Sequence, residues 1–125
     1  MAKVKQLTVS LENRPGALAE VAKLLGDAKV NVVALLGSAA GSQGSVQFVV
    51  DQAGKAKKVL AKAGLPFTEG TLEAFEMVNK PGVLAEVTGK LAKKGLNIEA
   101  VYATTPKGAK KATLLVAVSQ PPSGM

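Results

Sequence analysis

One sequence module occurs twice in this chain. The segment Asn13-Arg14-Pro15-Gly16-Ala17-Leu18-Ala19-Glu20-Val21 returns 66 residues later as Asn79-Lys80-Pro81-Gly82-Val83-Leu84-Ala85-Glu86-Val87. Without any gap, ten of the 24 positions in residues 13–36 are identical in residues 79–102. A fixed internal period indicates that one small structural unit is used repeatedly. We therefore expect a first unit in residues 1–70 and a second in residues 71–125, with two copies of whatever the repeated turn does.

Hydrophobic periodicity predicts the order strand, helix, strand, strand, helix, strand in the first unit. Side chains alternate over residues 4–11 and again over 46–50, which is typical of half-buried strands. Apolar residues at helical spacing predict helices over residues 18–25, with Pro15 at the helix start, and over 56–63. Residues 30–37 are nearly all aliphatic, which predicts a strand buried on both faces, and a short strand follows near Phe67. This order indicates an α+β, ferredoxin-like βαββαβ unit with an antiparallel sheet.

The second unit follows the same order but is truncated to βαββ. Phe75 and Met77 match Val9 and Leu11, and Leu114 and Val116 match Phe48 and Val50. After Val118 only residues 119–125 remain, which are too few and too rich in proline for a further helix and strand. Since one helix covers about half of a small sheet face, we expect the second unit to leave apolar surface and a strand edge without cover.

The strands also carry aliphatic residues on the face that we expect to lie away from the helices. These are Leu35, Val49, Val101 and Leu115. A sheet that is apolar on both sides must pack on both sides. Together with the truncated second unit, this pattern predicts a homodimer or an assembly with another protein.

The composition excludes several classes of function. The net charge is +7, but the lysines are spread along the chain and Arg14 is the one arginine, so a solvated basic surface is favoured over a nucleic-acid site. Cysteine and histidine are absent, and no cluster of carboxylates has metal-ligand spacing. We therefore expect no catalytic residues, no metal and no cofactor. No apolar run approaches a membrane span or a signal peptide, so a cytoplasmic location is expected.

The repeated Asn-x-Pro-Gly turn lies between a predicted strand and a predicted helix. The first N–H groups of a helix have no partner within it and carry partial positive charge, which suits a carboxylate. Gly16 and Gly82 let a ligand approach the backbone and tolerate positive φ, and the amides of Asn13 and Asn79 can donate or accept. A zwitterion finds both complements in one place. The alternative is that these asparagines only cap turns or helices and that the glycines only serve the turn.

At these residues the chain resembles the ACT domain family, small regulatory modules that bind amino acids. The resemblance covers residues 4–70 as a full unit and about 71–118 as a partial one, and includes Val30-Asn31-Val32 and Leu96-Asn97-Ile98 at the start of the following strands. It implies a ferredoxin-like fold whose units pair side by side, with an amino acid at the interface and the second strand of a neighbouring unit closing the pocket. The implied ligand-binding residues are Asn13, Pro15, Gly16, Ala17 and Leu18, their counterparts Asn79, Pro81, Gly82, Val83 and Leu84, and more weakly Asn31 and Asn97. Arg14 and Lys80 are further candidates from the same turns: we expect them to be exposed, with contact to a ligand carboxylate as the alternative.

The sequence therefore favours a non-enzymatic sensor of a free amino acid, small or apolar in view of the aliphatic surroundings. Such a sensor would report to a separate protein, for example an enzyme partner. Two alternatives stay open. One is an RNA-binding module, because some RNA binders share this fold with exposed aromatic residues on the sheet, although the central strands here offer little besides Phe48. The other is a structural regulatory subunit whose pockets have lost their ligand.

Overall fold

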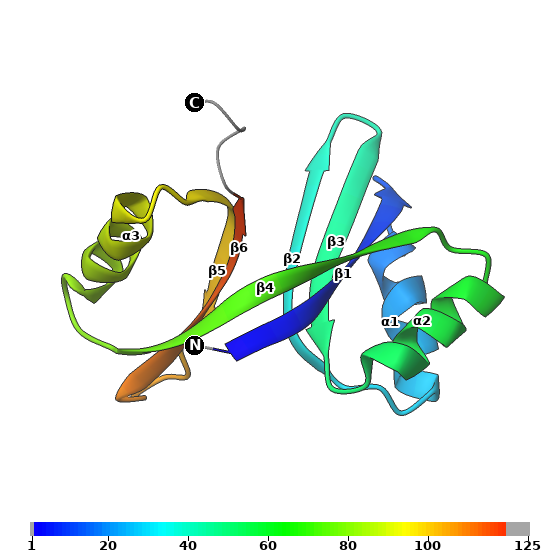
Figure 1. Cartoon of the computed structure of the whole chain (residues 1–125). Coiled ribbons are helices and arrows are strands. Elements are labelled where there is room, and N and C mark those ends of the chain that lie inside the picture. The colour runs from blue at the N-terminus through cyan, green and yellow to red at the C-terminus, as the bar shows by residue number, and fades with distance from the viewer. Residues whose placement is uncertain (1, 120–125) are drawn as a thin grey trace. The chain divides into compact units, whose positions relative to one another are not determined.

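The computed structural model describes residues 2–119 and has an α+β architecture, with antiparallel strands and helices in the expected order (Figure 1). The predicted fold class is confirmed. The C-terminal segment that we judged too short for further elements lies, from residue 120 on, outside the described residues. The elements are β1 (Ala2–Glu12), α1 (Ala17–Asp27), β2 (Val32–Ala40), β3 (Gln43–Val50), α2 (Ala53–Lys62), β4 (Phe67–Val78), α3 (Val83–Lys93), β5 (Asn97–Thr104) and β6 (Lys111–Ser119).

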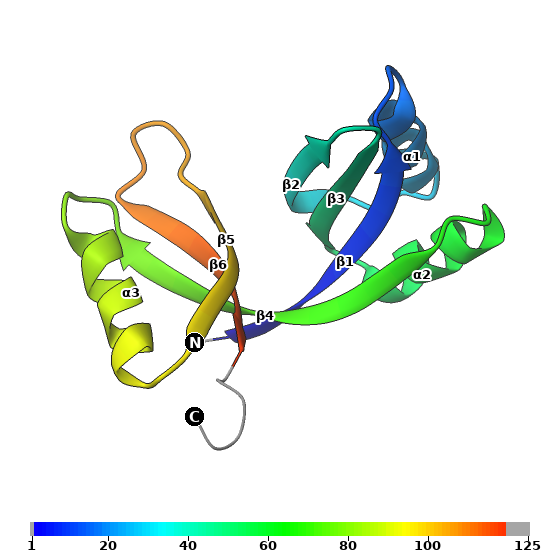
Figure 2. The same ribbon diagram turned by 90° about the horizontal axis from the view of Figure 1, so that it is seen from above.

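The chain separates into two compact units, each with its own strand order. Residues 5–70 form one unit, in which the strands are arranged β2-β3-β1-β4. Figure 2 shows α1 and α2 on the same side of these strands. In the core, Leu7, Val9 and Phe48 of the sheet pack with Val21 and Leu60 of the helices, and each is almost fully buried. Burying one such side chain contributes about 1.5–3 kcal/mol, so this double helical cover is the main support of the unit.

Within the described residues, the other unit contains residues 2–4 together with residues 71–119, and its strands are arranged β1-β4-β6-β5. The place beside β4 that a closing strand would take is therefore occupied by the first residues of β1. Of β1, the residues up to Val4 belong to this unit, so they cover part of the edge that we expected to be open. A second difference is that β4 runs unbroken from Phe67 to Val78, where the sequence predicted a short strand and then a separate one.

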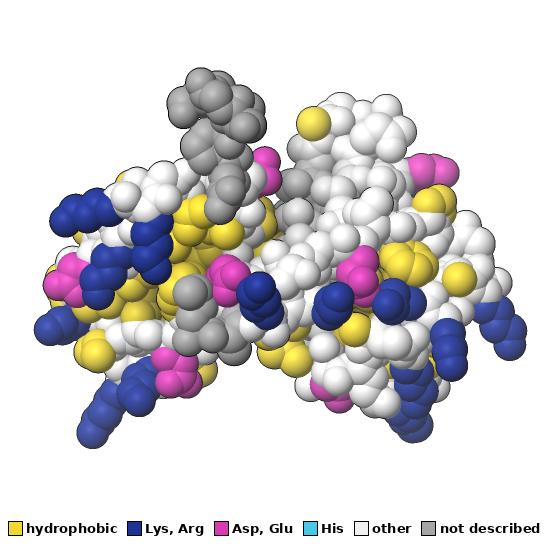
Figure 3. All heavy atoms as spheres, in the orientation of Figure 1, with side chains coloured by type: hydrophobic (Ala, Val, Ile, Leu, Met, Phe, Trp, Pro, Cys, Tyr) yellow, Lys and Arg dark blue, Asp and Glu magenta, His cyan; other side chains and the backbone are white. Residues whose placement is uncertain are grey.

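The expected apolar surface of this unit is present. Its helix α3 packs on a smaller core of Leu91, Leu114 and Val116, and the hydrophobic residues around this core are only partly buried. Phe75, for example, is partly exposed, whereas its counterpart Val9 is fully buried. Hydrophobic side chains gather on the surface beside α3 (Figure 3).

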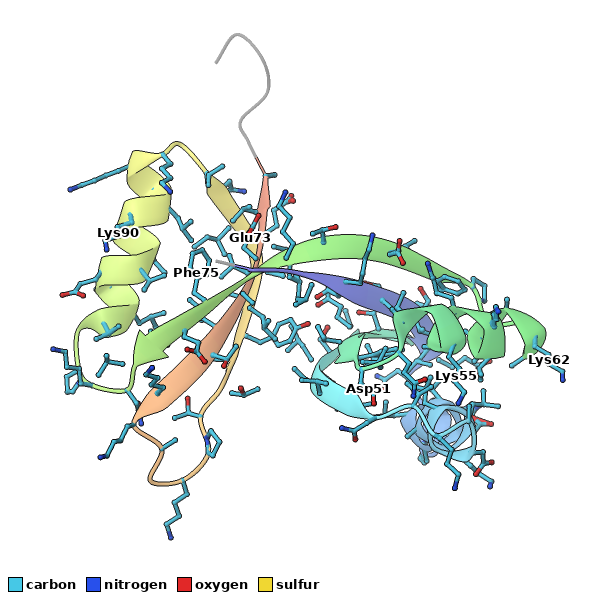
Figure 4. All side chains as sticks on the ribbon, turned by 60° about the horizontal axis from the view of Figure 1, so that its bottom comes forward. Asp51, Lys55, Lys62, Glu73, Phe75 and Lys90 are labelled. Atoms are coloured by element: carbon cyan, nitrogen blue, oxygen red, sulfur yellow. The ribbon has the colours of Figure 1, made fainter. Side chains whose placement is uncertain are left out.

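At two positions where the first copy has leucine, this unit has a charged residue. Leu7 and Leu24 of the first copy correspond to Glu73 on β4 and Lys90 on α3, which are labelled in Figure 4 together with Phe75. In the first copy, Leu7 is buried beneath α1 and α2. A charged side chain is almost never fully buried unless it is paired, so both changes are those expected where no second helix covers the sheet.

The strand pairing corrects two expectations about single residues. An irregularity between Val32 and Ala34 shifts the register of β2, so Leu35 pairs with Phe48 and faces the helix side, not the opposite side. The same irregularity in β5, between Ile98 and Ala100, places Val101 opposite Val116 on the helix side. Both residues lie on edge strands and are about half exposed, at 52% and 43%.

The matching of the last strands also needs correction. Val9 pairs with Val46 and the corresponding Phe75 pairs with Leu114, so Leu114 matches Val46, not Phe48. The β5–β6 hairpin is therefore two residues longer than the β2–β3 hairpin. By the same pairing, Val116 matches Phe48, because Glu73 pairs with Val116 where Leu7 pairs with Phe48.

Strand β2 is an edge strand and not the doubly buried strand that its aliphatic sequence predicted. Most of its residues are exposed, and only Ala34 is buried. No helix among residues 2–119 is both long and apolar enough to cross a membrane.

Candidate functional site

Each repeated turn forms a tight corner between a strand and a helix. Gly16 has φ 88° and ψ −13° at the N-cap of α1, and Gly82 has φ 90° and ψ −17° at the N-cap of α3. A residue with a Cβ pays roughly 1–2 kcal/mol to adopt this left-handed conformation, so glycine is required by the backbone alone. We expected Pro15 at the start of the helix, but it precedes the N-cap Gly16, and the first helical residue is Ala17.

The corners leave backbone donors unpaired. In the first, Ala17 N–H donates to Arg14 O at 3.3 Å and Glu20 N–H donates to Gly16 O at 3.0 Å. The N–H groups of Gly16, Leu18 and Ala19 then have no hydrogen-bond partner in the described part of the chain. The second corner repeats this arrangement with Gly82, Leu84 and Ala85. Three unpaired donors at the positive end of a helix dipole can receive a carboxylate.

The corner asparagines hold each corner against the tip of the neighbouring hairpin. Asn13 Nδ2–H donates to Gly41 O at 2.7 Å, and the Asn13 backbone N–H donates to Ser42 O at 3.0 Å. Asn79 repeats both contacts, with Ala109 O at 3.1 Å and Lys110 O at 2.8 Å. Neither side chain caps a helix. The side-chain NH2 group of each asparagine therefore has a structural role. The Oδ1 atom of each accepts no hydrogen bond from residues 2–119.

The two corners differ in charge. Arg14 Nη2 lies 2.5 Å from Glu20 Oε2 and Arg14 Nε lies 3.3 Å from Glu12 Oε2. The hydrogen bond to Glu20 raises the pKa of Arg14 above its ordinary value, with a smaller contribution from Glu12. At the second corner Lys80 forms no ion pair within residues 2–119. Arg14 is thus held by two carboxylates, whereas Lys80 has no acidic partner in that part of the chain.

A cavity of about 360 Å³ opens beside the first corner. This volume lies within the range of small-molecule sites. The end of β1 and the β2–β3 hairpin form its floor, where the register places Leu11 opposite Gly44 and Gly37 opposite Val46. Ala17 and Leu18 at the start of α1 form another wall. The lining residues are Leu11, Glu12, Asn13, Arg14, Ala17, Leu18, Gly37, Ser38, Ala39, Gly44, Ser45 and Val46.

A second cavity, of about 320 Å³, also lies against the first helical turn of α1. Its walls include Leu24 of α1 together with Ala63 and Leu65, which follow α2. Arg14 and Ala17 line both cavities. The ion pairs of Arg14 with Glu12 and Glu20 therefore hold its side chain between the two cavities.

The structure gathers some of the sequence-based candidates and separates others. Asn13, Arg14, Ala17 and Leu18 line the first cavity, while Pro15 and Gly16 shape the corner without lining it. Asn31 does not line it, because its backbone is paired with Asp51 beyond the far end of β2 and β3. The second-copy candidates Asn79, Lys80, Pro81, Gly82, Val83 and Leu84 form the corresponding corner, and Asn97 pairs with Ser119 at the far end of β5.

The residues that sequence reasoning missed come from the end of β1 and from the β2–β3 hairpin. They are Leu11, Glu12, Gly37, Ser38, Ala39, Gly44, Ser45 and Val46. A glycine inside a strand weakens it and often marks a place where another group approaches closely, and this was the one signal available. Among residues 2–119, no group of three or more acidic side chains is placed to hold a metal ion.

Comparison with known proteins gives a consistent picture. The chain matches the family model of the ACT domain pair over residues 2–117. The crystal structure of protein BT0572 from Bacteroides thetaiotaomicron superposes with a TM-score of 0.88 at 29% identity, covering 94% of this chain and 81% of that one. The ligand-free regulatory subunit of aspartate kinase from Thermus thermophilus has a TM-score of 0.68 at 20% identity, with coverage of 91% and 82%. The corresponding subunit from Thermus flavus has a TM-score of 0.66 at 19% identity, with the same coverage. A search of curated proteins found no significant match.

Proposed function

The chain belongs to the ACT domain pair family, and on that premise we propose that it is a non-enzymatic regulatory protein that binds a free amino acid. Family membership supports a small-molecule-binding regulatory role. The finer proposal is that the ligand is a small or apolar amino acid, bound at the strand-to-helix corners. The carrying observation is the cavity of about 360 Å³ beside three unpaired backbone N–H groups.

The cavity offers a complement for each part of an amino acid. The α-carboxylate would accept from the N–H group of Leu18, which is the member of the three unpaired donors whose residue lines the cavity. The α-ammonium would donate to Asn13 Oδ1 or to Glu12, both of which belong to the cavity wall. The side chain would lie on the apolar floor that Leu11 and Val46 provide.

The exposed edge of β2 supports a dimer that closes this cavity. Residues 30–50, which include the whole β2–β3 hairpin, contain no charged residue. Natural proteins usually protect an exposed strand edge with charges or proline, because unpaired N–H and C=O groups invite another strand. The edge strand β5, by contrast, carries Glu99. We propose that β2 pairs with β2 of a second copy, which would cover the open side of the cavity.

Regulation would follow from the same arrangement. A ligand that binds the closed dimer better than the open one shifts the equilibrium towards the closed form by its difference in affinity. The proposed receiver of this signal is a separate protein, such as an enzyme that the dimer contacts. Two of the superposing structures are regulatory subunits of aspartate kinase, and at 19–20% identity they support the fold only.

The RNA-binding alternative has no observation in its favour. Phe48, its best aromatic candidate, is 2% exposed and lies beneath the helices, so it cannot stack on a base. On the face away from the helices Tyr102 pairs with Leu115, and one aromatic residue alone is a small platform for stacking bases. The ligand-free scaffold is retained as an outcome of the following test.

The test is a thermal-shift screen with each of the twenty standard L-amino acids at millimolar concentration, followed by calorimetric titration of those that raise Tm. Binding to the folded state alone raises stability by about 2.7 kcal/mol at a ligand concentration of one hundred times Kd. Sedimentation should show a dimer with and without the amino acid. The absence of any shift across the panel would refute the amino-acid sensor and favour the scaffold.

Leu18→Glu is the variant that addresses the corner. Leu18 is about half exposed, and a negative charge in the first helical turn suits the helix dipole, so the fold should be retained. The added carboxylate should repel the α-carboxylate and weaken binding at least about tenfold, which is 1.4 kcal/mol. Ala22→Glu places the same charge one turn further along α1 and should leave affinity nearly unchanged.

A further inference from the structure

The two corners share their backbone geometry but not the residues that surround it. The strand pairing identifies the matched positions without ambiguity: Leu11 opposite Gly44 becomes Met77 opposite Ala112, and Val9 opposite Val46 becomes Phe75 opposite Leu114. In the same way Gly37, which pairs with Val46, becomes Ala103, which pairs with Leu114. Differences in size at these positions can therefore be compared one by one.

At four matched positions of the cavity the second copy carries the larger residue, whereas Glu12 and Arg14 are replaced by the smaller Val78 and Lys80. Gly37 becomes Ala103, Gly44 becomes Ala112 and Val46 becomes Leu114, and each change adds one carbon atom. On the helix wall Ala17 becomes Val83, which adds two. Ala112, Leu114 and Val83 are all buried, so these extra atoms lie inside the unit and not in solvent.

Gly37 is a small residue of the first copy that the backbone does not require. Its φ is not in the left-handed region, and the nearest heavy atom to a Cβ at this position would be Ser45 O, at 4.0 Å. A glycine in a strand costs stability relative to alanine, yet nothing in the chain's own packing excludes alanine here. Gly44 differs, because its Cβ would lie 3.2 Å from Ser38 O. Space at Gly37 therefore serves something other than the fold of this chain.

We infer that the two corners are not equivalent: each chain binds one amino acid, at the first corner, and the second corner is a filled structural copy. The inference rests on the proposed function, since it assigns that function to one of the two repeats. The first corner keeps a cavity bounded by Gly37, Gly44 and Ala17, while the second has Ala103, Ala112 and Val83 in their places. The second corner then holds α3 and the β5–β6 hairpin together through Asn79.

The experiment counts bound molecules per chain. Native mass spectrometry of the full chain, with the standard L-amino acid that gives the largest rise in Tm, should show at most one bound molecule per chain at saturation. Gly37→Ala/Val46→Leu gives the first corner the floor of the second and should weaken binding at least about tenfold, because even one surplus methylene in a snug apolar pocket costs that much. Sedimentation should show that this variant keeps the oligomeric state of the wild type.

Two further variants separate loss of binding from loss of folding. Gly37→Ala alone should raise Tm, because alanine suits a strand better than glycine, while still weakening binding. The mirrored variant Ala103→Gly/Leu114→Val should lower Tm and leave affinity and stoichiometry unchanged.

Two bound molecules per chain, or wild-type affinity in Gly37→Ala/Val46→Leu, would overturn the single-site inference while leaving the sensor function intact. A lack of binding by all twenty amino acids would refute the proposed function itself, and the single-site inference with it.

Discussion

Replacing Gly16 by alanine is expected to destabilise the protein even though there is room for the added methyl group. The nearest heavy atom to a Cβ at this position would be Arg14 Nη1, at 3.8 Å, which is ordinary van der Waals contact. The cost arises from φ 88°, where an L-residue is strained by roughly 1–2 kcal/mol. Gly82→Ala should cost the same, since φ is 90° and no heavy atom lies within 4 Å of the place that the methyl group would take.

Gly26 and Gly89 provide the matched controls. They lie within α1 and α3, have φ in the ordinary helical region, and also have no heavy atom within 4 Å of an added Cβ. Alanine is a better helix former than glycine by about 0.5–1 kcal/mol, so both substitutions should stabilise the protein. The corner variants and the helix variants should therefore differ in sign and lie about 1.5–3 kcal/mol apart.

The assay is urea denaturation of the four single variants, monitored by circular dichroism. For each variant, the slope m of the unfolding free energy against urea concentration is compared with that of the wild type. An unchanged m means that any shift of the midpoint reports stability and not a change in the denatured state. If Gly16→Ala were as stable as the wild type, the left-handed corner would not be a property of the folded protein. If Gly26→Ala were destabilising, the distinction between corner and helix glycines would fail.

Three further outcomes are expected. The Glu69 carboxylate lies 2.8 Å from Lys57 Nζ and 3.5 Å from Lys5 Nζ, and the hydrogen bond from Lys57 lowers the pKa of Glu69 below its ordinary value of 4.5, so the contribution of this carboxylate to stability is present above pH 4.5 and lost as the pH falls. Glu69→Gln should therefore be less stable than the wild type at neutral pH and should lose less stability on acidification. Urea midpoints that change in parallel with pH in both proteins would contradict this. Leu60→Ala, at a fully buried side chain of α2, should cost about 2–5 kcal/mol in chemical denaturation, and a loss under about 1 kcal/mol would show that α2 is not packed as described. Asn13→Ala removes the side-chain hydrogen bond to Gly41 O and should cost about 0.5–1.5 kcal/mol. It should also speed exchange of the backbone amide at position 13, which donates to Ser42 O at the hairpin tip, and unchanged exchange would exclude the side-chain tether.

The sequence was most informative where structure is decided by neighbouring residues. The repeat, the helices and the positive φ at Gly16 and Gly82 follow from periodicity and from the behaviour of glycine, and all are present in the structure. The strand over residues 30–37 shows the limit of this reasoning. Its aliphatic composition predicted burial on both faces, but the chain places it at the edge of its unit, where most of its residues are exposed.

The site was predictable in part for the same reason. Asn13, Arg14, Ala17 and Leu18 were found because they belong to one short motif. The hairpin residues that complete the cavity were not, since Asn13 meets Gly41 across 28 positions of the chain. No local preference indicates which side of a hairpin will face a corner so distant in sequence.

By itself, the amino-acid sequence determined that this protein contains two related units, each with a glycine-capped strand-to-helix corner, because these features depend on spacing and on backbone preferences over a few residues. The tertiary structure alone decided that the start of β1 lies beside β4, that irregularities in β2 and β5 turn Leu35 and Val101 towards the helices, and that a cavity persists beside Gly37. Register and cavity volume depend on the packing of segments far apart in the chain, where a shift of one residue reverses the face of a side chain and one added carbon can fill a void.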